Sequence, residues 1–403
     1  MQDLSLEKAV DLLLAHCQRV TAVEEVPLIS ALGRILAEDY IASFDNPPFD
    51  RSPLDGYTFA AEETAGHGAD KPAQFKIIGE ECAGDFFDQP VPAGCALRIM
   101  TGGAIPKGCN CVVRQEDVTV DGDTLTVPFS IEPYTNFCYA GEDIKQGTKL
   151  AKKGTKLTAA HIGVLASMGF ATVRVLGNVR IAIASTGDEL LQPGQPLAPG
   201  KIYNSNLYLL ASRLQELGFA PEVAGILPDD VEAAAKVIQG YRDRVDVFLT
   251  TGGVSVGKKD IMHGVVENVG KRLFWRVSMK PGGPALAYTM GETLGIALSG
   301  NPFAAYATFE LLAVPVLSHI SGNDKILPRR TQAVLTDDFP KESKGRRFIR
   351  GYYENGKVRL PEQHASGSLF SMVGCNAFVD IPAGTGKLAK ETEVDIVRLY
   401  RVK

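Results

Sequence analysis

From Val179 onward, the chain alternates short apolar runs with segments whose apolar residues recur at helical spacing. The apolar runs are "VRIAIAST", "PEVAGIL", "VDVFLTT" and "LGIALSG". The helical stripes follow them at residues 207–217, 229–241, 261–269 and 301 to about 320. Apolar strands that alternate with amphipathic helices predict a parallel sheet with helices on both faces. We therefore expect a multidomain α/β protein whose central domain, residues 177–326, is a doubly wound, mostly parallel sheet.

The rest of the chain has a different pattern on each side of this domain. The N-terminal region, residues 1–176, opens with two helical stripes, at residues 6–17 and 28–36. Within it, short apolar runs separated by Gly, Pro and Asp turns predict an inserted small β subdomain of five or six strands at about residues 45–142. A helical stretch at residues 159–168 follows. Short strands and turns return at residues 327–403, which predicts a C-terminal β domain.

Composition and charge exclude several classes of protein. The 403 residues are 45% hydrophobic and 22% charged, which is typical of a soluble globular protein. The net charge of -5 gives no general attraction to nucleic acid or to an anionic membrane, so we expect neither as a partner. Acidic residues near the start exclude a signal peptide, and no apolar stretch has the length of a membrane span. The seven scattered cysteines, with Cys109 and Cys111 as the only close pair, favour reduced thiols and a cytoplasmic enzyme.

Short polar motifs follow the expected parallel strands. In open doubly wound sheets, ligands bind beyond the carboxyl ends of the strands. Each motif alone also fits an ordinary helix start, because Asp and Asn are good N-caps and Pro is favoured in the first turn. Four such motifs at one sheet edge favour a binding site instead. They are "STGDE" at residues 185–189, which includes Ser185, Thr186 and Gly187, "LPDD" at 227–230, "TTGGVSVGKKD" at 250–260 and "LSGNP" at 298–302.

The segment "GGVSVGKKD", residues 252–260, is one residue short of a P-loop. Its Gly and Lys spacing is complete, but Lys259 stands where a P-loop needs the hydroxyl that binds magnesium. Glycines let backbone N–H groups approach an anion, and the helix start near Asp260 adds the positive end of a dipole. The segment therefore predicts a loop that cradles phosphate and obtains its metal ligands elsewhere. The predicted loop residues are Gly252, Gly253, Ser255 and Gly257.

Several carboxylates belong to the same sheet edge, where they would repel a phosphate unless a hard cation lay between them. Mg²⁺ prefers a few carboxylates together with substrate phosphates, so it is the natural candidate. We therefore predict a magnesium site built from several strand ends. The candidate ligands are Asp188, Glu189, Asp229, Asp230 and Asp260, of which Asp229 and Asp230 are alternatives.

Basic residues gather in two later segments. "WRVSMKPGGPA" carries Arg276 and Lys280 around a tight turn, and "GRRFIRG" carries three arginines ahead of the serine-rich "HASGSLFS". Arginine forks and hydroxyls suit an oxyanion such as phosphate, sulfate or molybdate. The alternatives are a hairpin with ordinary surface cations and a solvated strand edge. The candidate residues are Lys280, Arg346, Arg347, Arg350, Ser366, Ser368 and Ser371.

Taken in order, these motifs resemble one family, the MoeA molybdopterin molybdenumtransferases, which include the E domain of gephyrin. The resemblance covers nearly the whole chain. Several long motifs in order are far more specific than any single glycine loop. The motifs are "SPLDGY", "IMTGGAIPKGC", "GEDI", "STGDEL", "GGVSVGKKD", "KPGGP" and "SGNP".

The resemblance implies molybdenum cofactor biosynthesis: adenylylated molybdopterin is cleaved with release of AMP, and molybdate is inserted in a Mg²⁺-dependent step. It also implies a homodimer, with a molybdopterin adenylyltransferase as a further candidate partner. By matching positions, Lys280, Arg350 and Ser366 would hold molybdate, while Glu189, one of Asp229 and Asp230, and Asp260 would handle metal and pterin phosphate. The implied catalytic residues are Asp55, Thr101, Asp143, Glu189, Asp260 and Lys280.

Two positions depart from the family pattern. Gly283 stands where family members commonly have a second lysine, and Ala304 where they commonly have a serine. The pocket thus lacks one charge and one hydroxyl, so either Arg346 or Arg347 compensates, or the protein handles another oxyanion such as tungstate. Two other hypotheses remain for the function. One is a non-catalytic pterin-binding scaffold dimer, which would not need the carboxylates. The other is a P-loop nucleotidase, which Lys259 disfavours.

Overall fold

The computed structural model describes residues 3–255 and 260–399. The chain divides into two compact units, which are Met1–Glu24 with Leu176–Lys403 (unit 1) and Glu25–Val175 (unit 2). Each unit has its own sheets and its own apolar core.

Unit 1 is built on a six-stranded sheet with the order β14-β11-β15-β18-β17-β16. β14, β11, β15 and β18 run parallel, β17 pairs antiparallel with β18, and β16 pairs antiparallel with β17, so that β16 runs in the direction of the four parallel strands. Every residue of β11, β15 and β18 is buried, as expected for strands covered on both faces. The predicted mostly parallel sheet is confirmed. The strands are β11 (Ile181–Thr186), β14 (Glu222–Leu227), β15 (Val247–Thr251), β16 (Lys271–Trp275), β17 (Leu286–Met290) and β18 (Thr293–Leu298).

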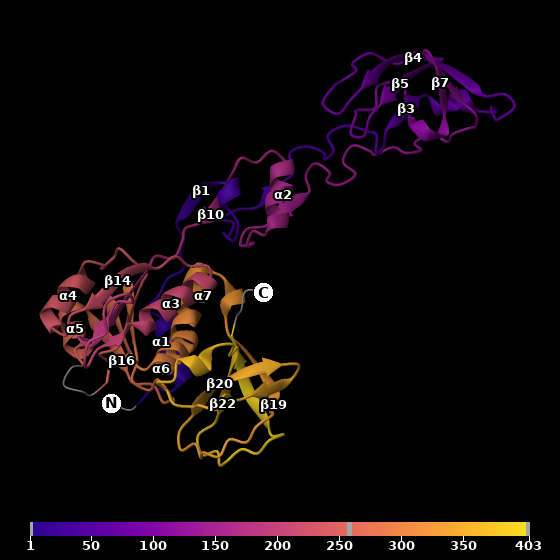
Figure 1. Ribbon diagram of the computed structural model, residues 1–403. Helices are drawn as coiled ribbons and strands as arrows, with labels where there is room; N and C mark the ends of the chain where they lie inside the picture. Colours follow the sequence, from indigo (N-terminus) through magenta and orange to yellow (C-terminus); the bar gives the residue numbers. More distant parts are fainter. Residues whose placement is uncertain (1–2, 256–259, 400–403) are drawn as a thin grey trace. The chain divides into compact units, whose positions relative to one another are not determined.

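Helices cover both faces of this sheet (Figure 1). Successive residues of β11 point to opposite faces, so Ile183 packs in one apolar cluster and Ala182 in the other. The first cluster contains α1 (Leu6–Leu14), α3 (Ser205–Glu216), α6 (Pro302–Thr308) and α7 (Val314–Ser321), with a π-helical turn at Phe309–Ala313 between the last two. The second contains α4 (Val231–Gln239) and α5 (Met262–Val269).

Contrary to the prediction that no stretch has the length of a membrane span, the helical run Pro302–Ser321 is long and apolar enough to cross a membrane by length and composition. However, 83% of its most apolar window is buried inside the protein. This burial is typical of the core helix of a globular domain.

The start of the chain differs from the sequence prediction. Helix α1 belongs to unit 1, where Leu6 and Leu13 are buried and the helix packs on α7. The second predicted helix, at residues 28–36, is wrong: only a 3₁₀ turn, Leu28–Ser30, forms there. Leu32 is 63% exposed. Gly33 has φ +77°, a left-handed conformation that stops a right-handed helix.

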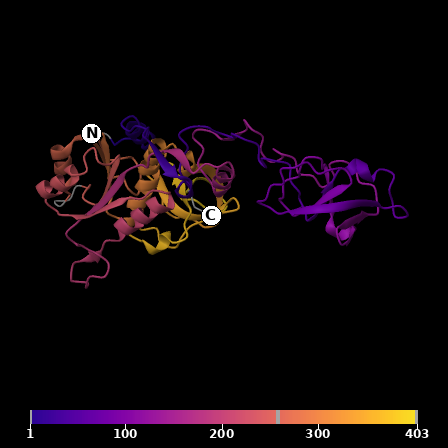
Figure 2. The ribbon, with the colours of Figure 1, turned by 90° about the horizontal axis from the view of Figure 1, so that it is seen from above.

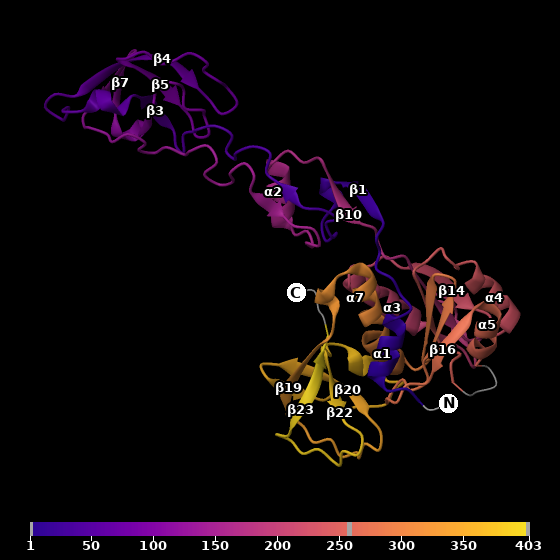
Figure 3. The ribbon, with the colours of Figure 1, turned by 180° about the vertical axis from the view of Figure 1, so that it is seen from behind.

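The C-terminal β domain is a closed barrel with the order β19-β21-β20-β22-β23 (Figure 3). Its interior is apolar, whereas Phe348 and Phe378 pack in the cluster that holds α6 and α7. The yellow barrel strands accordingly lie beside the orange helices when the chain is seen from above (Figure 2). The barrel strands are β19 (Arg329–Leu335), β20 (Arg347–Glu354), β21 (Lys357–Arg359), β22 (Ala377–Ile381) and β23 (Glu393–Arg398).

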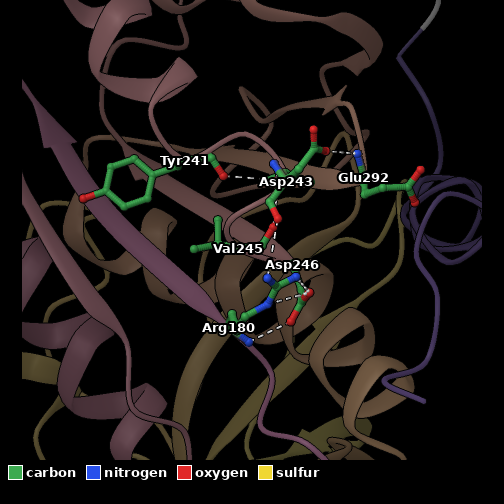
Figure 4. Close-up of polar contacts among 7 residues, drawn as sticks. Arg180, Tyr241, Asp243, Val245, Asp246 and Glu292 are labelled. Atoms are coloured by element: carbon green, nitrogen blue, oxygen red, sulfur yellow. Dashed lines mark hydrogen bonds and ion pairs between the residues drawn. The ribbon is translucent and has the colours of Figure 1, made fainter. Parts of the chain in front are cut away.

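Polar contacts close the edge of the sheet at the amino ends of the parallel strands (Figure 4). Arg180 donates to Asp246 through its backbone N–H at 2.7 Å and through Nη2 at 2.6 Å. Asp243 accepts from the Glu292 N–H at 2.7 Å, which fixes the β17–β18 turn. These contacts tie together the segments that lead into β11, β15 and β18.

Unit 2 contains a six-stranded sheet with the order β6-β3-β5-β4-β8-β7. The predicted all-β unit of five or six strands is confirmed, with its first strand at Gly56 (Figure 1). Smaller pairs, β1 with β10 and β2 with β9, accompany helix α2. The elements are β1 (Val23–Pro27), β2 (Tyr40–Ile41), β3 (Gly56–Phe59), β4 (Ala73–Glu81), β5 (Cys95–Ile99), β6 (Cys111–Arg114), β7 (Thr119–Asp121), β8 (Thr124–Val127), β9 (Lys149–Ala151), α2 (Ala159–Ser167) and β10 (Thr172–Leu176).

Candidate functional site

The four polar motifs lie at the carboxyl ends of β11, β14, β15 and β18, which are neighbours in the sheet. Residues from all four motifs border one cleft of about 1240 Å³, which lies wholly in unit 1. The facing wall comes from the turn at residues 279–284 and from the C-terminal barrel. The cleft therefore brings together segments that are far apart in the sequence, as expected for a site at the strand ends. The barrel residues on its wall include Phe339, Lys341, Arg347, His364 and Ser366.

Glycines at the end of β15 allow two strand ends to approach closely. Gly252 has φ +96°, and a Cβ there would lie 2.7 Å from both Thr186 O and Thr186 Oγ1. A Cβ on Gly253 would lie 2.8 Å from Thr186 Oγ1. However, the Gly252 N–H donates to Leu298 O at 3.0 Å. The sheet therefore uses this N–H, and the prediction that the glycine loop cradles an anion stays a prediction for its other backbone groups.

Side-chain amides tie the strand ends to helix α3. The Asn206 amide donates to Thr251 Oγ1 at 2.9 Å and to Gly300 O at 2.7 Å. Ser185 donates to Asn204 Oδ1 at 2.9 Å. Thr186 Oγ1, Asn204 Nδ2 and Asn206 Oδ1 are buried and have no hydrogen-bond partner in the part of the chain that the structure describes. Buried polar atoms of this kind indicate a floor that a polar ligand or water completes.

The acidic residues of the first two motifs have separate roles. The Asp188 N–H donates to Asp229 Oδ2 at 3.0 Å, and the Asp229 N–H donates to Asp188 Oδ1 at 3.4 Å. Asp230 is instead the N-cap of α4 and accepts from the Ala233 N–H at 2.8 Å. Asp229 lines the cleft, whereas Asp188 and Asp230 are not among its lining residues. Of the two alternatives left open by the sequence, the structure favours Asp229.

Glu189, Asp229 and Asp260 are the acidic residues among the described lining of the cleft. Within residues 3–255 and 260–399, no three His, Cys, Asp or Glu side chains are grouped so that they could hold a metal ion. The predicted carboxylate metal site is therefore not present as a preformed cluster within the described residues. One physical reason is that Asp230 is used to cap α4. Mg²⁺ commonly binds one or two carboxylates and takes its other ligands from water and substrate phosphate, so Asp229 and Asp260 fit it only in that mode.

The facing wall of the cleft is basic. Arg276, Lys280, Lys341 and Arg347 all line it. Lys280 and Arg347 form a parallel β-bridge, in which Lys280 N–H donates to Arg346 O at 2.9 Å and Phe348 N–H donates to Lys280 O at 2.7 Å. The cleft thus has both carboxylates and cations on its lining. This arrangement suits a ligand that carries phosphate or another oxyanion.

Two predicted arginines do not line the cleft. Arg350 is 1% exposed, and its Nη2 donates to Gln363 O at 2.9 Å and to Ala365 O at 3.0 Å. It therefore supports the loop that carries Ser366. Arg346 is held by Asp380 at 2.7 Å and by Glu7 at 2.6 Å. Arg350 is not on the lining, but its Nε and Nη1 are buried with no hydrogen-bond partner in the described part of the chain, so its contact with the ligand stays a prediction.

His364 lies on the barrel wall, where its ring meets the Phe339 ring edge to face at 5.5 Å. Burial lowers the pKa of His364, and the nearby cations Arg350, Lys341 and Arg347 lower it further. The imidazole is therefore uncharged at neutral pH, and its buried Nδ1 has no partner among the described side chains and backbone. His364 opens the serine-rich segment "HASGSLFS", but only the serines of that segment were predicted to bind, and Lys341 belongs to none of the predicted motifs.

The predicted residues of the N-terminal region lie in unit 2. Asp55 Oδ1 accepts from the Thr101 N–H and from the Thr101 hydroxyl, both at 2.7 Å. These two donors hold the pKa of Asp55 below its ordinary value. Asp143 Oδ2 accepts from the Asn46 amide at 3.3 Å. The structure thus pairs Asp55 with Thr101 and gives Asp143 a different neighbour.

The cleft gathers most of the remaining predicted residues. Gly257 lies outside the described residues, as do Lys258 and Lys259. The predicted residues that line the cleft are Ser185, Thr186, Gly187, Glu189, Asp229, Gly252, Gly253, Ser255, Asp260, Lys280, Arg347 and Ser366.

The segment that forms the parallel sheet and its strand-end cleft belongs to a molybdopterin-binding class of protein. Residues 182–319 match the family described as "Probable molybdopterin binding domain". Residues 4–169 match "MoeA N-terminal region (domain I and II)", and residues 332–399 match "MoeA C-terminal region (domain IV)". Together the three matches extend over almost the whole chain.

Curated relatives cover the same length. The molybdopterin molybdenumtransferase of Bacillus subtilis (strain 168) is 34% identical over 379 residues, which is 92% of this chain and 88% of the relative. That of Haemophilus influenzae is 32% identical and covers 98% of each chain. A solved structure of the molybdopterin biosynthesis MoeA protein from Pyrococcus horikoshii has a TM-score of 0.84 at 29% identity, covering 98% of this chain and 99% of the other. The chain belongs to the MoeA family of molybdopterin molybdenumtransferases, which are transferases.

Proposed function

We propose that the protein inserts molybdate into adenylylated molybdopterin and releases AMP in a Mg²⁺-dependent reaction. The observation that carries this proposal is that one cleft is lined both by acidic residues of the strand ends and by basic residues, two of them from the barrel. A nucleotide-linked pterin needs a phosphate site, and molybdate needs cations and hydroxyls. The cleft offers both in unit 1.

The residues in and around the cleft have different roles in this proposal. Gly252 and Gly253 let the strand ends of β15 and β11 meet, which shapes the floor under the pterin phosphate. Lys280 and the Ser366 hydroxyl, both on the lining, bind and orient the oxyanion. Arg350 is a positioning residue, because it holds the carbonyls of Gln363 and Ala365 behind that loop.

Asp229 and Asp260 would hold Mg²⁺ together with phosphate oxygens and water. When bound, the ion neutralises phosphate charge and polarises the phosphoanhydride bond that is cleaved. Glu189, which is exposed on the same wall, adds a third carboxylate within the lining. The carboxylates serve the metal side of the cleft, whereas the lysine and serine serve the oxyanion side.

We further propose a cytoplasmic homodimer in which Asp55 and Thr101 act at the cleft of the partner subunit. This proposal is supported by the location of the Asp55–Thr101 pair in unit 2, whereas the cleft lies wholly in unit 1. Light scattering should give a mass near twice 43.3 kDa. Mixed dimers of two inactive variants, Asp55→Asn and Asp260→Asn, should regain activity, and a strictly monomeric active protein would contradict the arrangement.

A molybdopterin adenylyltransferase, which would supply the adenylylated substrate, is the proposed heterologous partner. Sedimentation of the two proteins together tests it.

The direct test of function is incubation of the pure protein with adenylylated molybdopterin, Mg²⁺ and either molybdate or tungstate. We expect AMP release and metal-bound pterin, with both lost in Asp260→Asn and on chelation of Mg²⁺. The tungstate arm tests whether the chain without a lysine at position 283 prefers another oxyanion. Wild-type turnover by Asp260→Asn would contradict the metal assignment, and pterin binding without any turnover would favour the scaffold alternative.

A further inference from the structure

The turn that carries Lys280 supplies less positive charge than a bound dianion would need. A tetrahedral dianion held away from bulk water needs compensating cations, since an unpaired buried charge is costly. Lys280 supplies one such charge. Gly283 also lines the cleft but has no side chain to supply another.

Arg347 lies beside Lys280 because the two residues are partners in a parallel β-bridge. The bridge between them is parallel, and its two hydrogen bonds measure 2.9 and 2.7 Å. Paired residues of neighbouring strands lie about 4.8 Å apart and project their side chains on the same side. Because both side chains line the cleft, one ligand can meet the ammonium and the guanidinium together.

The guanidinium of Arg347 is weakly held within the described residues. Its Nη2 donates to Glu342 O at 3.4 Å, a long contact, and its Cζ lies 5.6 Å from the centroid of the Phe339 ring. Its Nε is buried without a hydrogen-bond partner in the described part of the chain. Most of its donor capacity is therefore available to a ligand.

Two other arginines near the turn are already paired. Arg346 makes charge-assisted bonds to Asp380 and Glu7 at 2.6–2.8 Å. Arg276 Nε lies 3.3 Å from Asp3 Oδ1. Lys341 also lines the cleft and is exposed, as Lys280 is, but its backbone is not the one bridged to Lys280. Arg347 is the side chain that combines register, availability and partial burial.

We propose that Arg347 is the second cation of the oxyanion site and supplies, from barrel strand β20, the charge that Gly283 does not. The identity of the oxyanion as molybdate or tungstate rests on the proposed function above. Arg347 would grip two oxyanion oxygens through its planar fork, while Lys280 and the Ser366 hydroxyl contact the others. His364 is uncharged and cannot replace this charge at neutral pH.

The test is calorimetric titration of the full chain with molybdate and with tungstate at fixed low salt, with and without adenylylated molybdopterin. Arg347→Gln should weaken oxyanion binding by about 10- to 100-fold, the loss expected for charge-assisted bonds. Lys341→Gln removes the other barrel cation of the lining and should weaken binding less than Arg347→Gln does, whereas Lys357→Gln, an exposed barrel lysine outside the lining, should change it by less than about 3-fold. Thermal unfolding of each variant checks that the fold is retained.

A second experiment restores the lost positive charge at position 283. In the Arg347→Gln background, Gly283→Lys should recover binding to within about 3-fold of wild type, as expected if one charge replaces the other. Position 283 does not have positive φ, but a Cβ there would lie 3.1 Å from Met279 O, so Gly283→Ala reports the steric effect alone.

The proposal is overturned if Arg347→Gln binds like wild type, or if Lys341→Gln gives the larger loss. It is also overturned if Gly283→Lys restores nothing while Gly283→Ala is harmless, or if the wild type binds neither oxyanion in either condition. A failure of the proposed function looks different: oxyanion binding would depend on Arg347, but no AMP would be released from adenylylated molybdopterin.

Discussion

Asp55 accepts two hydrogen bonds of 2.7 Å from Thr101, one from the backbone N–H and one from the hydroxyl, although 46 residues separate them. The pair joins the motif that precedes strand β3 to the turn that follows strand β5. These donors stabilise the ionised carboxylate and lower the pKa of Asp55. Asp55 therefore stays charged throughout the neutral range.

Thr101→Val should raise the pKa of Asp55 toward its ordinary value, because it removes the hydroxyl donor and keeps the backbone donor. The measurement is an NMR titration of the Asp55 side-chain carboxyl carbon in both proteins. A Thr101→Ser variant keeps a hydroxyl and should titrate like wild type. An unchanged pKa in Thr101→Val would show that the backbone N–H alone determines the shift.

Gly252→Ala should destabilise unit 1 by about 2–5 kcal/mol, since it combines a left-handed backbone with a steric clash. The added Cβ would lie 2.7 Å from Thr186 O at φ +96°. Gly194 is a matched control, because it has φ +94° and a Cβ there would meet no atom within 4 Å. Gly194→Ala should therefore cost only about 1–2 kcal/mol. Denaturant midpoints measure both, and equal losses would argue against close packing of the strand ends.

Arg346→Gln should destabilise the protein by about 1–3 kcal/mol, whereas Arg347→Gln should have little effect on stability. The reason is that Arg346 donates to Asp380, which is 6% exposed. Burial opposes ionisation of Asp380, but the hydrogen bonds from Arg346 and Arg330 outweigh it, so its pKa is lowered. Denaturant unfolding of the two variants measures the difference, and equal stabilities would contradict it.

The same pair predicts the acid dependence of stability. A lowered folded-state pKa contributes stability above the unfolded value of about 3.9, and this stability is lost as the pH falls through the folded value. Arg346→Gln should therefore lose less stability than wild type between neutral pH and about pH 3. Chemical denaturation across that range measures it, and parallel curves for the two proteins would contradict the assignment.

His364 should make the protein less stable as the pH falls below about 6.5, its unfolded pKa. Its folded pKa is lowered by burial and by Arg350, Lys341 and Arg347, so the unfolded state binds the proton more readily. This destabilisation should stop growing below the folded pKa. His364→Gln should remove it, and an identical pH profile in wild type and variant would exclude His364 as its source.

The sequence predicts the parallel core of unit 1 well because the local pattern and the buried environment agree there. The burial of β11, β15 and β18 follows directly from their apolar runs. The wrong helix at residues 28–36 shows the opposite case, since three spaced leucines could not overcome the left-handed Gly33.

The site was predictable by residue type but not by the use of each backbone and side-chain group. The commitment of the Gly252 N–H to Leu298 depends on sheet pairing, and the burial of Arg350 depends on how the barrel packs. Neither follows from local spacing. The β-bridge between Lys280 and Arg347 joins residues 67 positions apart in the sequence, and only the fold determines it.

The most direct test of the central claim compares two adjacent carboxylates by single-turnover AMP release from adenylylated molybdopterin with Mg²⁺ and molybdate. Asp229 lines the cleft, whereas Asp230 caps α4 and accepts from the Ala233 N–H. Asparagine is as good an N-cap as aspartate, so Asp230→Asn should release AMP at the wild-type rate. Asp229→Asn keeps an acceptor for the Asp188 N–H but removes the charge, so it should release AMP at least about 100-fold more slowly, an effect of about 2.7 kcal/mol on the barrier. Equal rates for Asp229→Asn and wild type, or a loss confined to Asp230→Asn, would contradict the claim that this cleft performs the reaction.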